Sequence, residues 1–596
     1  MSRLQQLKAS VFELRCMTPV LRSLPKFALP NRPWGLARLL DERVASDPNN
    51  LALAYLDERY TFRDVDRRVN QYARLFQSRG IGQGDVVALL MDNRPDYVFV
   101  FYALARLRAV TSMINTNLSG HTLTHAVNVC KPKAMLVGAE HAQTLRAVLP
   151  ALASSGLSGR IWLQAEADNA ASLPGIERIN EAVAQQSDAR PVGITPPSSS
   201  ETLCLIYTSG TTGLPKAAIV TNRRWVGGGF LFGAALMEAT PRDIIYLPLP
   251  LYHSNAAVIG LGASLATGAA VALRRKFSAS HFWTDVRTFD ASLFVYIGEL
   301  CRYLLNTPKS PDERNHRLRL AVGNGLRPDI WEAFQKRFGV PLVREFYAAT
   351  EGNMPIFNFE GRPGMLGRRR VGQALVRCDA TSGEILRDKK GFCIEAQEGE
   401  RGILLIHINP LFSFDGYVDH RATQDKVVTD VFRRGDRYFN SGDVLELHED
   451  GWVSFADRVG DTFRWKGENV STNEVAEVLN GARGVLETAV YGVPVPNTEG
   501  KAGMAAISTG PDFDIEELAR YVAKQLPIYQ RPYFVRLQTS GVQVTGTFKH
   551  QKATYREEGY DPGKVRDPLF MLEGEKYVKL DPKLYQRLVK GELALR

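Results

Sequence analysis

Two kinds of hydrophobic pattern alternate along most of this chain of 596 residues. Short apolar runs, typical of buried strands, lie at 85–90, 134–137, 203–207, 243–247 and 291–296. Segments with helical spacing of apolar residues separate these runs; one begins after Thr61, a predicted N-cap, and ends near Gly80. Because strands that alternate with helices form largely parallel sheets covered by those helices, we expect an α/β fold.

The pattern changes at three places. Residues 168–200 are polar and irregular, which suggests a linker between two halves of the α/β region. Residues 372–443 contain short strands and glycine turns, which predict a small β-rich antiparallel subdomain. After Arg458 a new alternation of helices and strands indicates a small α+β domain. Since the chain is too long for a single core, we expect an N-terminal domain over 35–457 and a C-terminal domain over 458–596.

The first 34 residues form a basic segment, in which Glu13 is the single acidic residue. Its basic residues are Arg3, Lys8, Arg15, Arg22, Lys26 and Arg32. Its apolar residues at helical spacing are Leu4, Leu7, Val11, Leu14 and Met17, and the prolines expected to interrupt the helix are Pro19, Pro25, Pro30 and Pro33. Such a segment can lie in the interface of an anionic membrane, and it can equally pack as a helix on the body of the protein.

One internal segment, 256–273, carries no charge and precedes three basic residues. It is barely long enough to cross a bilayer, and it is rich in Ala and Gly rather than in Leu and Ile. Gly268 is a predicted helix end before a strand. We therefore favour a buried helix and strand over a membrane span.

Composition and charge narrow the classes of partner. The formal net charge of +10 is a mild bias toward anionic partners such as nucleotides, CoA or anionic lipid. No zinc-finger, helix-turn-helix or RNA-binding signature is present, so nucleic acid is not an expected partner. The 6 cysteines are scattered without a C-x-x-C pair, which indicates free thiols in a reducing compartment. We expect a cytoplasmic protein without a secretory signal peptide.

The most informative stretch reads Ile-Tyr-Thr-Ser-Gly-Thr-Thr-Gly-Leu-Pro-Lys at 206–216. It joins two predicted strands, 203–207 and 217–221, by a loop rich in hydroxyls and glycines that ends in Lys216. Such a loop can bring backbone N–H groups, hydroxyls and one ammonium onto a polyphosphate. Its spacing is not that of the Walker loop, and a surface turn is the ordinary alternative for this composition.

Further motifs follow in a fixed order along the chain. They are Tyr252-His253, Gly-Asn-Gly-Leu-Arg-Pro at 323–328, Tyr-Ala-Ala-Thr-Glu-Gly at 347–352, Asn-Ser-Gly-Asp at 440–443, Asp457-Arg458, Asp-Thr-Phe-Arg-Trp-Lys-Gly-Glu-Asn-Val-Ser at 461–471, and Thr-Gly-Thr-Phe-Lys-His-Gln-Lys at 545–552. Each alone has an ordinary structural explanation. Together with the loop at 206–216 they resemble the adenylate-forming superfamily of acyl-CoA synthetases, luciferases and peptide-synthetase adenylation domains. Residues 295–306, 346–353 and 463–469 and the tail from Asp567 closely resemble bacterial members of the fatty-acid-transport-protein / very-long-chain acyl-CoA synthetase group.

The resemblance implies an AMP-forming long-chain or very-long-chain fatty acid:CoA ligase that uses ATP, Mg²⁺ and CoA. In such a ligase a carboxylate attacks the α-phosphorus of ATP, and CoA then displaces AMP from the acyl-adenylate. Because the first step joins two anions, neutralisation and alignment must dominate catalysis. The residues implied at the β- and γ-phosphates are Ser209, Gly210, Thr211, Thr212, Gly213 and Lys216. Glu351, with Thr208, is implied at Mg²⁺, and Thr350 at the α-phosphate.

The same resemblance implies the nucleotide and thioester sides of the site. Tyr347 would stack on adenine opposite Gly323, Asn324 and Gly325, Asp443 would accept the ribose hydroxyls, and Arg458 would touch ribose or phosphates. Lys549 would bridge the carboxylate and the α-phosphate, and His253 would line the acyl side. A mobile C-terminal domain would deliver Lys549 first and then Lys466, Gly467 and Glu468 to the pantetheine channel.

The sequence departs from the family pattern at two positions. At the expected hinge it has Gly460 followed by Asp461, so either residue is the candidate pivot. After His253 it lacks the aromatic gate of some long-chain synthetases, and Trp225 is another candidate for that gate.

Other readings remain open on the sequence alone. Adenylation of another acid, transfer to another acceptor, and a membrane-associated uptake protein are the alternatives to a ligase. A long acyl chain resides in the membrane, so we expect peripheral attachment to the inner face of the cell membrane through 1–34.

Overall fold

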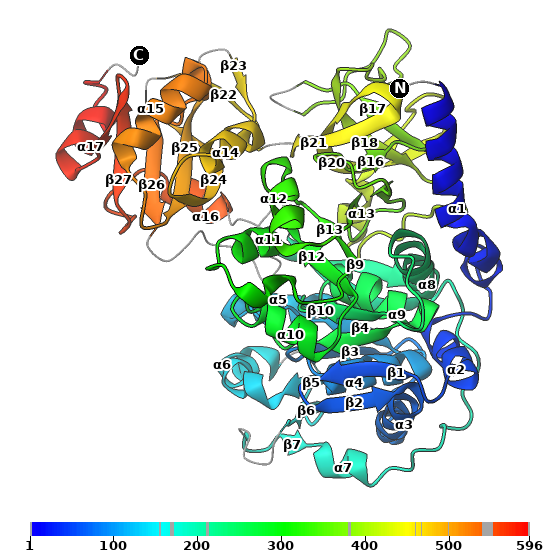
Figure 1. Ribbon diagram of the computed structural model, residues 1–596. Helices are drawn as coiled ribbons and strands as arrows, with labels where there is room; N and C mark the ends of the chain where they lie inside the picture. Colours follow the sequence, from blue (N-terminus) through cyan, green and yellow to red (C-terminus); the bar gives the residue numbers. More distant parts are fainter. Residues whose placement is uncertain are drawn as a thin grey trace. The chain divides into compact units, whose positions relative to one another are not determined.

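A computed structural model describes residues 3–153, 156–166, 172–209, 214–379, 383–458, 461–465, 468–496, 498, 500–538 and 552–593. The chain divides into two compact units (Figure 1). Unit 1 comprises Met1–Leu326, Ala333–Arg362 and Ile408–Val427. Unit 2 comprises Arg327–Glu332, Pro363–His407 and Val428–Arg596.

The first sheet of unit 1 has the strand order β7-β6-β5-β3-β4-β8-β9. Its strands in chain order are β3 (Val86–Leu90), β4 (Val110–Met113), β5 (Ala134–Gly138), β6 (Ile161–Gln164), β7 (Glu177–Arg178), β8 (Thr202–Ser209) and β9 (Pro215–Thr221). The pairs are parallel except for the antiparallel hairpin of β8 and β9. The predicted parallel arrangement is therefore confirmed, and the hairpin places one antiparallel strand at the sheet edge.

The second sheet of unit 1 has the order β15-β14-β13-β12-β10-β11-β1-β2. Its strands are β1 (Leu51–Tyr55), β2 (Glu58–Thr61), β10 (Ile244–Leu247), β11 (Ala270–Leu273), β12 (Leu293–Ile297), β13 (Leu320–Asn324), β14 (Val343–Tyr347) and β15 (Ile356–Asn358). Its inner pairs are parallel, and β2 and β15 are antiparallel edge strands.

Helices cover these sheets, as the alternating pattern predicted (Figure 1). The helices that lie wholly or partly in unit 1, besides the N-terminal one, are α2 (Leu36–Ser46), α3 (Phe62–Ser78), α4 (Pro95–Arg106), α5 (Gly120–Val129), η1 (Ala139–His141), α6 (Ala142–Leu152), α7 (Asn180–Ala184), α8 (Asn222–Gly228), η3 (Gly229–Leu236), η4 (Asn255–Gly260), α9 (Leu261–Thr267), α10 (Phe282–Thr288), α11 (Gly298–Leu305), η5 (Pro311–Arg314), α12 (Pro328–Phe338) and α13 (His420–Gln424). The predicted cap of α3 is confirmed, because the Thr61 side chain accepts from the Asp64 N–H and the Asp64 carboxylate accepts from the Thr61 N–H. Helix α4 packs against β4 on one side, and Phe99 lies edge-on to Tyr60 of β2, so α4 links the two sheets.

Two expectations about unit 1 were wrong. The polar stretch 168–200 is not a plain linker, because its described part contributes β7 and α7, anchored by the buried side chains of Ile179 and Val183. These elements are too short to show a hydrophobic period. Pro19 and Pro25 do not interrupt the N-terminal helix, and α1 continues from Arg3 to Phe27. Its packing on α8 and η3 outweighs the lost backbone hydrogen bonds.

The uncharged segment 256–273 comprises most of η4 and all of α9 and β11. Gly268, with φ of 81°, ends α9 in the left-handed conformation, as predicted. Close packing explains the small residues, because a Cβ on Gly229 of η3 would lie 2.5 Å from the Gly262 carbonyl oxygen of α9. Among the described residues, no helix combines the length and the hydropathy that a membrane crossing requires.

Unit 2 contains the predicted antiparallel subdomain. Its strands are β16 (Gly367–Arg368), β17 (Gln373–Val376), β18 (Arg401–His407), β19 (Val427–Thr429), β20 (Arg437–Leu447) and β21 (Trp452–Arg458), with η6 (Glu449–Gly451) between the last two. The order is β16-β21-β20-β18-β17, with β19 beside β20. Residues Ile408–Val427, which connect β18 to β19, belong to unit 1.

The C-terminal part of unit 2 is the predicted small α+β fold. It has a hairpin, β22 (Phe463–Trp465) and β23 (Glu468–Val470), and a five-stranded sheet of β24 (Val485–Pro494), β25 (Lys501–Thr509), β26 (Phe534–Gln538), β27 (Leu569–Glu573) and β28 (Lys576–Lys579). Its helices are α14 (Thr472–Asn480), α15 (Ile515–Gln525), η7 (Ile528–Gln530), α16 (Lys552–Glu558) and α17 (Pro582–Val589). A shared apolar core includes Trp465, Leu479 and Phe534.

Candidate functional site

The phosphate-loop motif lies on the hairpin of β8 and β9. Thr208 pairs with Lys216 across the two strands, and Ser209 pairs with Pro215. Directly opposed residues of an antiparallel pair project to the same face, so the Thr208 hydroxyl and the Lys216 ammonium emerge together. The predicted strand–loop–strand arrangement is thus confirmed, whereas Gly210, Thr211, Thr212 and Gly213 lie outside the described residues.

A segment of 408–427 pairs with the outer edge of this hairpin. The Ile219 N–H donates to the Gly416 carbonyl over 2.9 Å, the Val418 N–H donates to the Ala217 carbonyl over 3.0 Å, and Tyr417 bridges to Ala218. This backbone pairing fixes Tyr417 beside β9.

Tyr417 connects the phosphate-loop strand to the motif at 347–352. Its Oη donates a hydrogen bond of 2.7 Å to Oε1 of Glu351, and the Thr208 side chain lies close enough to the phenol to lower its pKa in part. Burial and the neighbouring Glu351 carboxylate raise the pKa of Tyr417, so the phenol keeps its proton. The structure therefore brings Thr208 and Glu351, the two predicted magnesium ligands, to one shared neighbour. A hydroxyl and a carboxylate are hard oxygen donors that fit this ion.

The side chain of Arg224, in α8, supports the backbone of the motif at 347–352. Its guanidinium donates to the carbonyls of Ala349, Thr350 and Gly352, three groups that face no strand partner. Burial lowers the pKa of Arg224, and the Asp415 and Glu351 carboxylates oppose that effect. An arginine suits this buried position because a guanidinium keeps its charge on burial more readily than a lysine ammonium does. The sequence motifs did not identify Arg224 or Tyr417; only their folded positions do.

The His253 turn touches two other predicted site segments. Next to His253, the Ser254 hydroxyl lies 3.2 Å from the Thr350 hydroxyl. Asn255 donates a hydrogen bond of 2.8 Å to Asn324. The structure thus brings the His253 segment to the predicted α-phosphate and adenine segments.

Trp225, the other candidate for a gate, is completely buried and donates through Nε1 to the Ala257 carbonyl, which is a packing role.

The predicted adenine segments lie at the carboxyl ends of adjacent parallel strands. Gly323 on β13 pairs in register with Glu345 on β14, and Tyr347 ends β14. A Cβ on Gly323 would lie 2.3 Å from the Tyr296 carbonyl oxygen, so only glycine fits there. The carboxyl edge of parallel strands is the usual position of a ligand crevice in α/β sheets. Gly323, Asn324, Gly325 and Tyr347 therefore lie at one edge of the sheet, and their contact with adenine stays a prediction.

Glu345 lies beneath this glycine loop and was not predicted. Its carboxyl oxygens accept hydrogen bonds from the Gly325 N–H at 3.0 Å, the Leu326 N–H at 2.8 Å and the Tyr296 hydroxyl at 2.8 Å. Only 2% of its surface is exposed, and burial raises its pKa to about 8. A buried carboxyl group thus binds the free backbone groups of the loop.

The remaining candidates lie in unit 2. Asp443 on β20 is 4% exposed and pairs in register with Arg458 on β21, so these two predicted nucleotide contacts are neighbours. Glu468 is exposed at the start of β23. The side chain of Arg458 and the residues Lys466, Gly467 and Lys549 lie outside the described residues.

Asp461, one of two candidate pivots, is tied to helix α16. Its carboxylate bonds Lys552 Nζ at 3.2 Å and Arg556 at 2.7 Å. These two cations outweigh desolvation and lower the pKa of Asp461. Asp461 therefore belongs to the C-terminal fold, while Gly460 lies outside the described residues.

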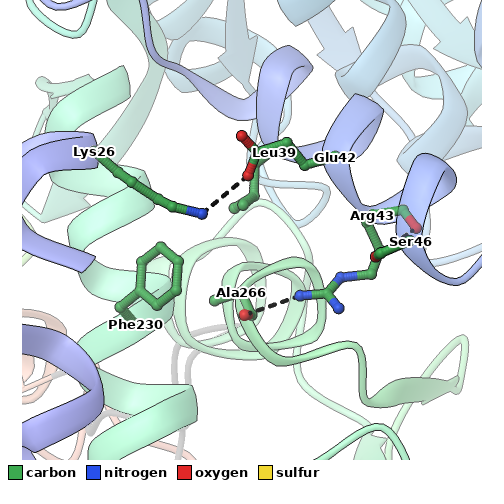
Figure 2. A pocket seen from close by; sticks show the side chains of 7 residues that line it. All are labelled: Lys26, Leu39, Glu42, Arg43, Ser46, Phe230 and Ala266. Carbon is green, nitrogen blue, oxygen red and sulfur yellow. Dashed lines mark hydrogen bonds and ion pairs between the residues drawn. The ribbon is translucent and has the colours of Figure 1, made fainter. Parts of the chain in front are cut away.

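Two further features of unit 1 lie apart from the predicted site residues. A cavity of about 230 Å³ is lined by residues of α1, α2, η3 and α9, among them Lys26, Arg43 and Phe230 (Figure 2). Lys26 binds Glu42 at 2.9 Å, and Arg43 donates to the Ala266 carbonyl, so both cations are engaged within the fold.

Asp92, Glu140 and His141 also form a potential metal-ligand cluster. Arg94 and Lys276 lie beside those carboxylates and take the place of a metal's positive charge.

The pKa of Glu345 generates a pH prediction. Between pH 4.5 and about 8 the folded protein holds a proton that the unfolded chain releases, so this group makes the free energy of unfolding fall as the pH rises. We expect Glu345→Gln to remove that component, which is a few kcal/mol at most, from urea unfolding measured between pH 5 and pH 8.

Glu313→Gln is the matched control. Glu313 is also buried, but its hydrogen bonds with Arg337 lower its pKa, so it titrates below this window. An unchanged pH dependence in Glu345→Gln would contradict the assignment.

Comparison with known proteins agrees with this geometry. The model of a family described as AMP-binding enzyme matches residues 40–417, and that of the AMP-binding enzyme C-terminal domain matches residues 474–549. Long-chain fatty acid transport protein 2 of Rattus norvegicus is 40% identical over 569 residues, covering 93% of this chain and 90% of the relative. The medium/long-chain-fatty-acid–CoA ligase FadD6 of Mycobacterium tuberculosis is 38% identical over 550 residues, covering 92% of this chain and 89% of the relative.

A similar solved structure is that of the anthranilate CoA ligase AuaEII in complex with anthranoyl-AMP. It has a TM-score of 0.76 and 22% identity, covering 90% of this chain and 98% of that chain, and at this identity the likeness shows the fold. The family match spans more than half of the chain, and the relatives match nearly all of it. The chain therefore belongs to the AMP-binding enzyme family.

Proposed function

We propose that this protein is an AMP-forming ligase that joins long-chain or very-long-chain fatty acids to CoA. The observation that carries the proposal is the meeting of Thr208, Lys216 and Glu351 around the phosphate-loop hairpin. Relatives named as a fatty-acid–CoA ligase and as long-chain fatty acid transport proteins support the choice of acid.

The first half-reaction needs a fatty carboxylate to approach the α-phosphate of ATP. The carboxylate oxygen forms a bond to phosphorus, and pyrophosphate leaves with the electrons of the broken P–O bond. Repulsion between the anions is relieved by Lys216, by the loop residues Ser209, Gly210, Thr211, Thr212 and Gly213, and by Lys549 at the carboxylate. Thr350 contacts the α-phosphate. Mg²⁺, held by Glu351 and Thr208, supplies positive charge to the phosphates when bound.

The nucleoside is held at the sheet edge. Tyr347 stacks on adenine, and Gly323, Asn324 and Gly325 line the other side. Asp443 accepts both ribose hydroxyls, because a carboxylate matches a vicinal diol, and Arg458 contacts the ribose or the phosphates.

The second half-reaction transfers the acyl group to sulfur. The CoA thiolate attacks the acyl carbon, and AMP leaves as the C–O bond breaks. His253 lines the acyl side, and Lys466, Gly467 and Glu468 form the pantetheine channel. Rotation at a hinge, Gly460 or Asp461, between domains 35–457 and 458–596 moves Lys549 out of the site and brings the residues of this channel in. The ion pairs of Asp461 with α16 favour Gly460 as the pivot.

The direct test is to incubate the protein with ATP, Mg²⁺, CoA and fatty acids from short to very long. We expect AMP and acyl-CoA in equal amounts, with long acids preferred. Lys549→Ala should reduce acyl-adenylate formation at least about a hundredfold, since it removes charge stabilisation of the transition state.

Other outcomes separate the alternatives. Acyl-adenylate that accumulates with CoA present would indicate another acceptor. No AMP with any fatty acid would contradict the proposal and favour another acid. Fatty-acid uptake by cells that survives Lys216→Ala and Glu351→Ala would favour an uptake protein.

We further propose that α1 attaches the protein to the inner, reducing side of an anionic membrane. Its buried face holds Cys16 and Val20, and its exposed face carries Leu14 and Leu21, which are 61% and 47% exposed. The basic residues Arg15 and Arg22 share that exposed face. Exposed leucines beside arginines suit the interface of an anionic bilayer. The 6 free cysteines support a reducing compartment.

Sedimentation with vesicles tests this attachment. We expect binding to phosphatidylglycerol-containing vesicles that weakens with salt and is lost in Leu14→Ser/Leu21→Ser, because apolar insertion and charge act together. Leu411→Ser is the control, since Leu411 is 50% exposed outside α1. Equal binding by both variants would contradict the role of α1.

A further inference from the structure

Tyr417 is the side chain on which both predicted magnesium ligands converge. Its hydroxyl donates to Oε1 of Glu351 over 2.7 Å, and the Thr208 side chain lies close enough to lower the pKa of the phenol in part. Thr208 lies next to the last residue of a strand of the first sheet, whereas Glu351 follows a strand of the second sheet. The phenol of Tyr417 therefore links the two sheets at the point where the triphosphate would bind.

The backbone around Tyr417 is held independently of that hydroxyl. Tyr417 pairs with Ala218, and its N–H donates to the Thr423 hydroxyl at 2.9 Å. Gly416 has a φ of 74°, and a Cβ there would lie 2.5 Å from Thr423, so the turn requires glycine. Only 5% of Tyr417 is exposed, and its ring packs with Ala218 and Ala422. Removing the hydroxyl alone would leave these contacts in place.

Among the described residues, the Tyr417 hydroxyl forms a hydrogen bond with the Glu351 carboxylate, and the Arg224 guanidinium adds an electrostatic attraction. Arg224 holds the backbone on either side of Glu351 through the Thr350 and Gly352 carbonyls. That contact fixes the loop but not the rotation of the Glu351 side chain. The phenol occupies one oxygen of the carboxylate, Oε1, and so restricts the direction of the other.

We propose that Tyr417 is a positioning residue for adenylate formation, which holds the Glu351 carboxylate beside Thr208 in the orientation that receives the magnesium–triphosphate. The inference rests on the ligase function proposed above. It assigns Tyr417 to the first half-reaction alone, because the second starts from acyl-adenylate and CoA and involves no triphosphate. A merely structural tyrosine would affect both half-reactions or neither.

The test uses Tyr417→Phe, which removes one oxygen atom. The matched control is Tyr72→Phe, because Tyr72 is also buried and donates to a carboxylate, Asp96, over 2.6 Å. Mn²⁺ serves as the metal probe, and its binding with a non-hydrolysable ATP analogue is measured by electron paramagnetic resonance. Adenylation is followed as pyrophosphate release against Mg²⁺ concentration, and thioester formation starts from preformed acyl-adenylate.

We expect Tyr417→Phe to weaken Mn²⁺ binding about tenfold and to raise the Mg²⁺ concentration for half-maximal adenylation by a similar factor, as loss of a hydrogen bond to a charged group has effects of about this size. Thioester formation should match that of the control. Wild-type metal dependence in Tyr417→Phe, or equal loss of both half-reactions, would overturn the proposal.

Glu351→Gln separates this inference from the proposed function. If Glu351→Gln loses metal binding and adenylation while Tyr417→Phe keeps both, the positioning role is overturned and the ligase assignment stands. If neither variant is impaired, the assignment of Glu351 to the metal is overturned together with the role of Tyr417.

Discussion

The hydrogen bond from Tyr417 to Glu351 is the contact on which the arrangement of the candidate site depends. It joins three segments that are distant in sequence: the β8–β9 hairpin, the loop after β14 and the connection 408–427. A site that brings a carboxylate to a triphosphate must concentrate donors and positive charge at one place, and no single segment of this chain supplies them all. In this fold, β8 of the first sheet and β14 of the second sheet lead into the same site, and the segment 408–427 pairs with the edge of the first sheet beside it.

Two buried side chains, a guanidinium and a carboxyl group, use opposite chemistry to hold the neighbouring loops. Arg224 donates to carbonyls of the loop at 349–352, and Glu345 accepts N–H groups of the loop at 325–326. Loops at a strand end lack ladder partners, and unpaired buried backbone groups are costly. Each of these two side chains satisfies several such groups at once, so short loops rich in small residues keep a defined shape next to a ligand. This shape is what a preorganised site requires.

The sequence predicted those features that depend on local pattern. Thr61 was identified as a helix cap and Gly268 as a helix end because capping follows from the residue type and the adjoining period. The candidate residues Thr208, Lys216, Tyr347 and Glu351 were found because their motifs are contiguous. Tyr417, Arg224 and Glu345 could not be found, since each acts through contacts across long sequence separations and none has a motif of its own. The helix through Pro19 was missed because tertiary packing overrides local propensity.

The central claim is that a fatty carboxylate is activated as an acyl-adenylate, and the fate of a carboxylate oxygen tests it most directly. A long-chain fatty acid labelled with oxygen-18 in its carboxyl group is incubated with the protein, ATP, Mg²⁺ and CoA, and the AMP is analysed by mass spectrometry. Since the carboxylate oxygen becomes the bridge to phosphorus and remains there when the thiolate attacks the acyl carbon, the account predicts one labelled oxygen in each AMP. Unlabelled AMP, or label in inorganic phosphate instead, would contradict it.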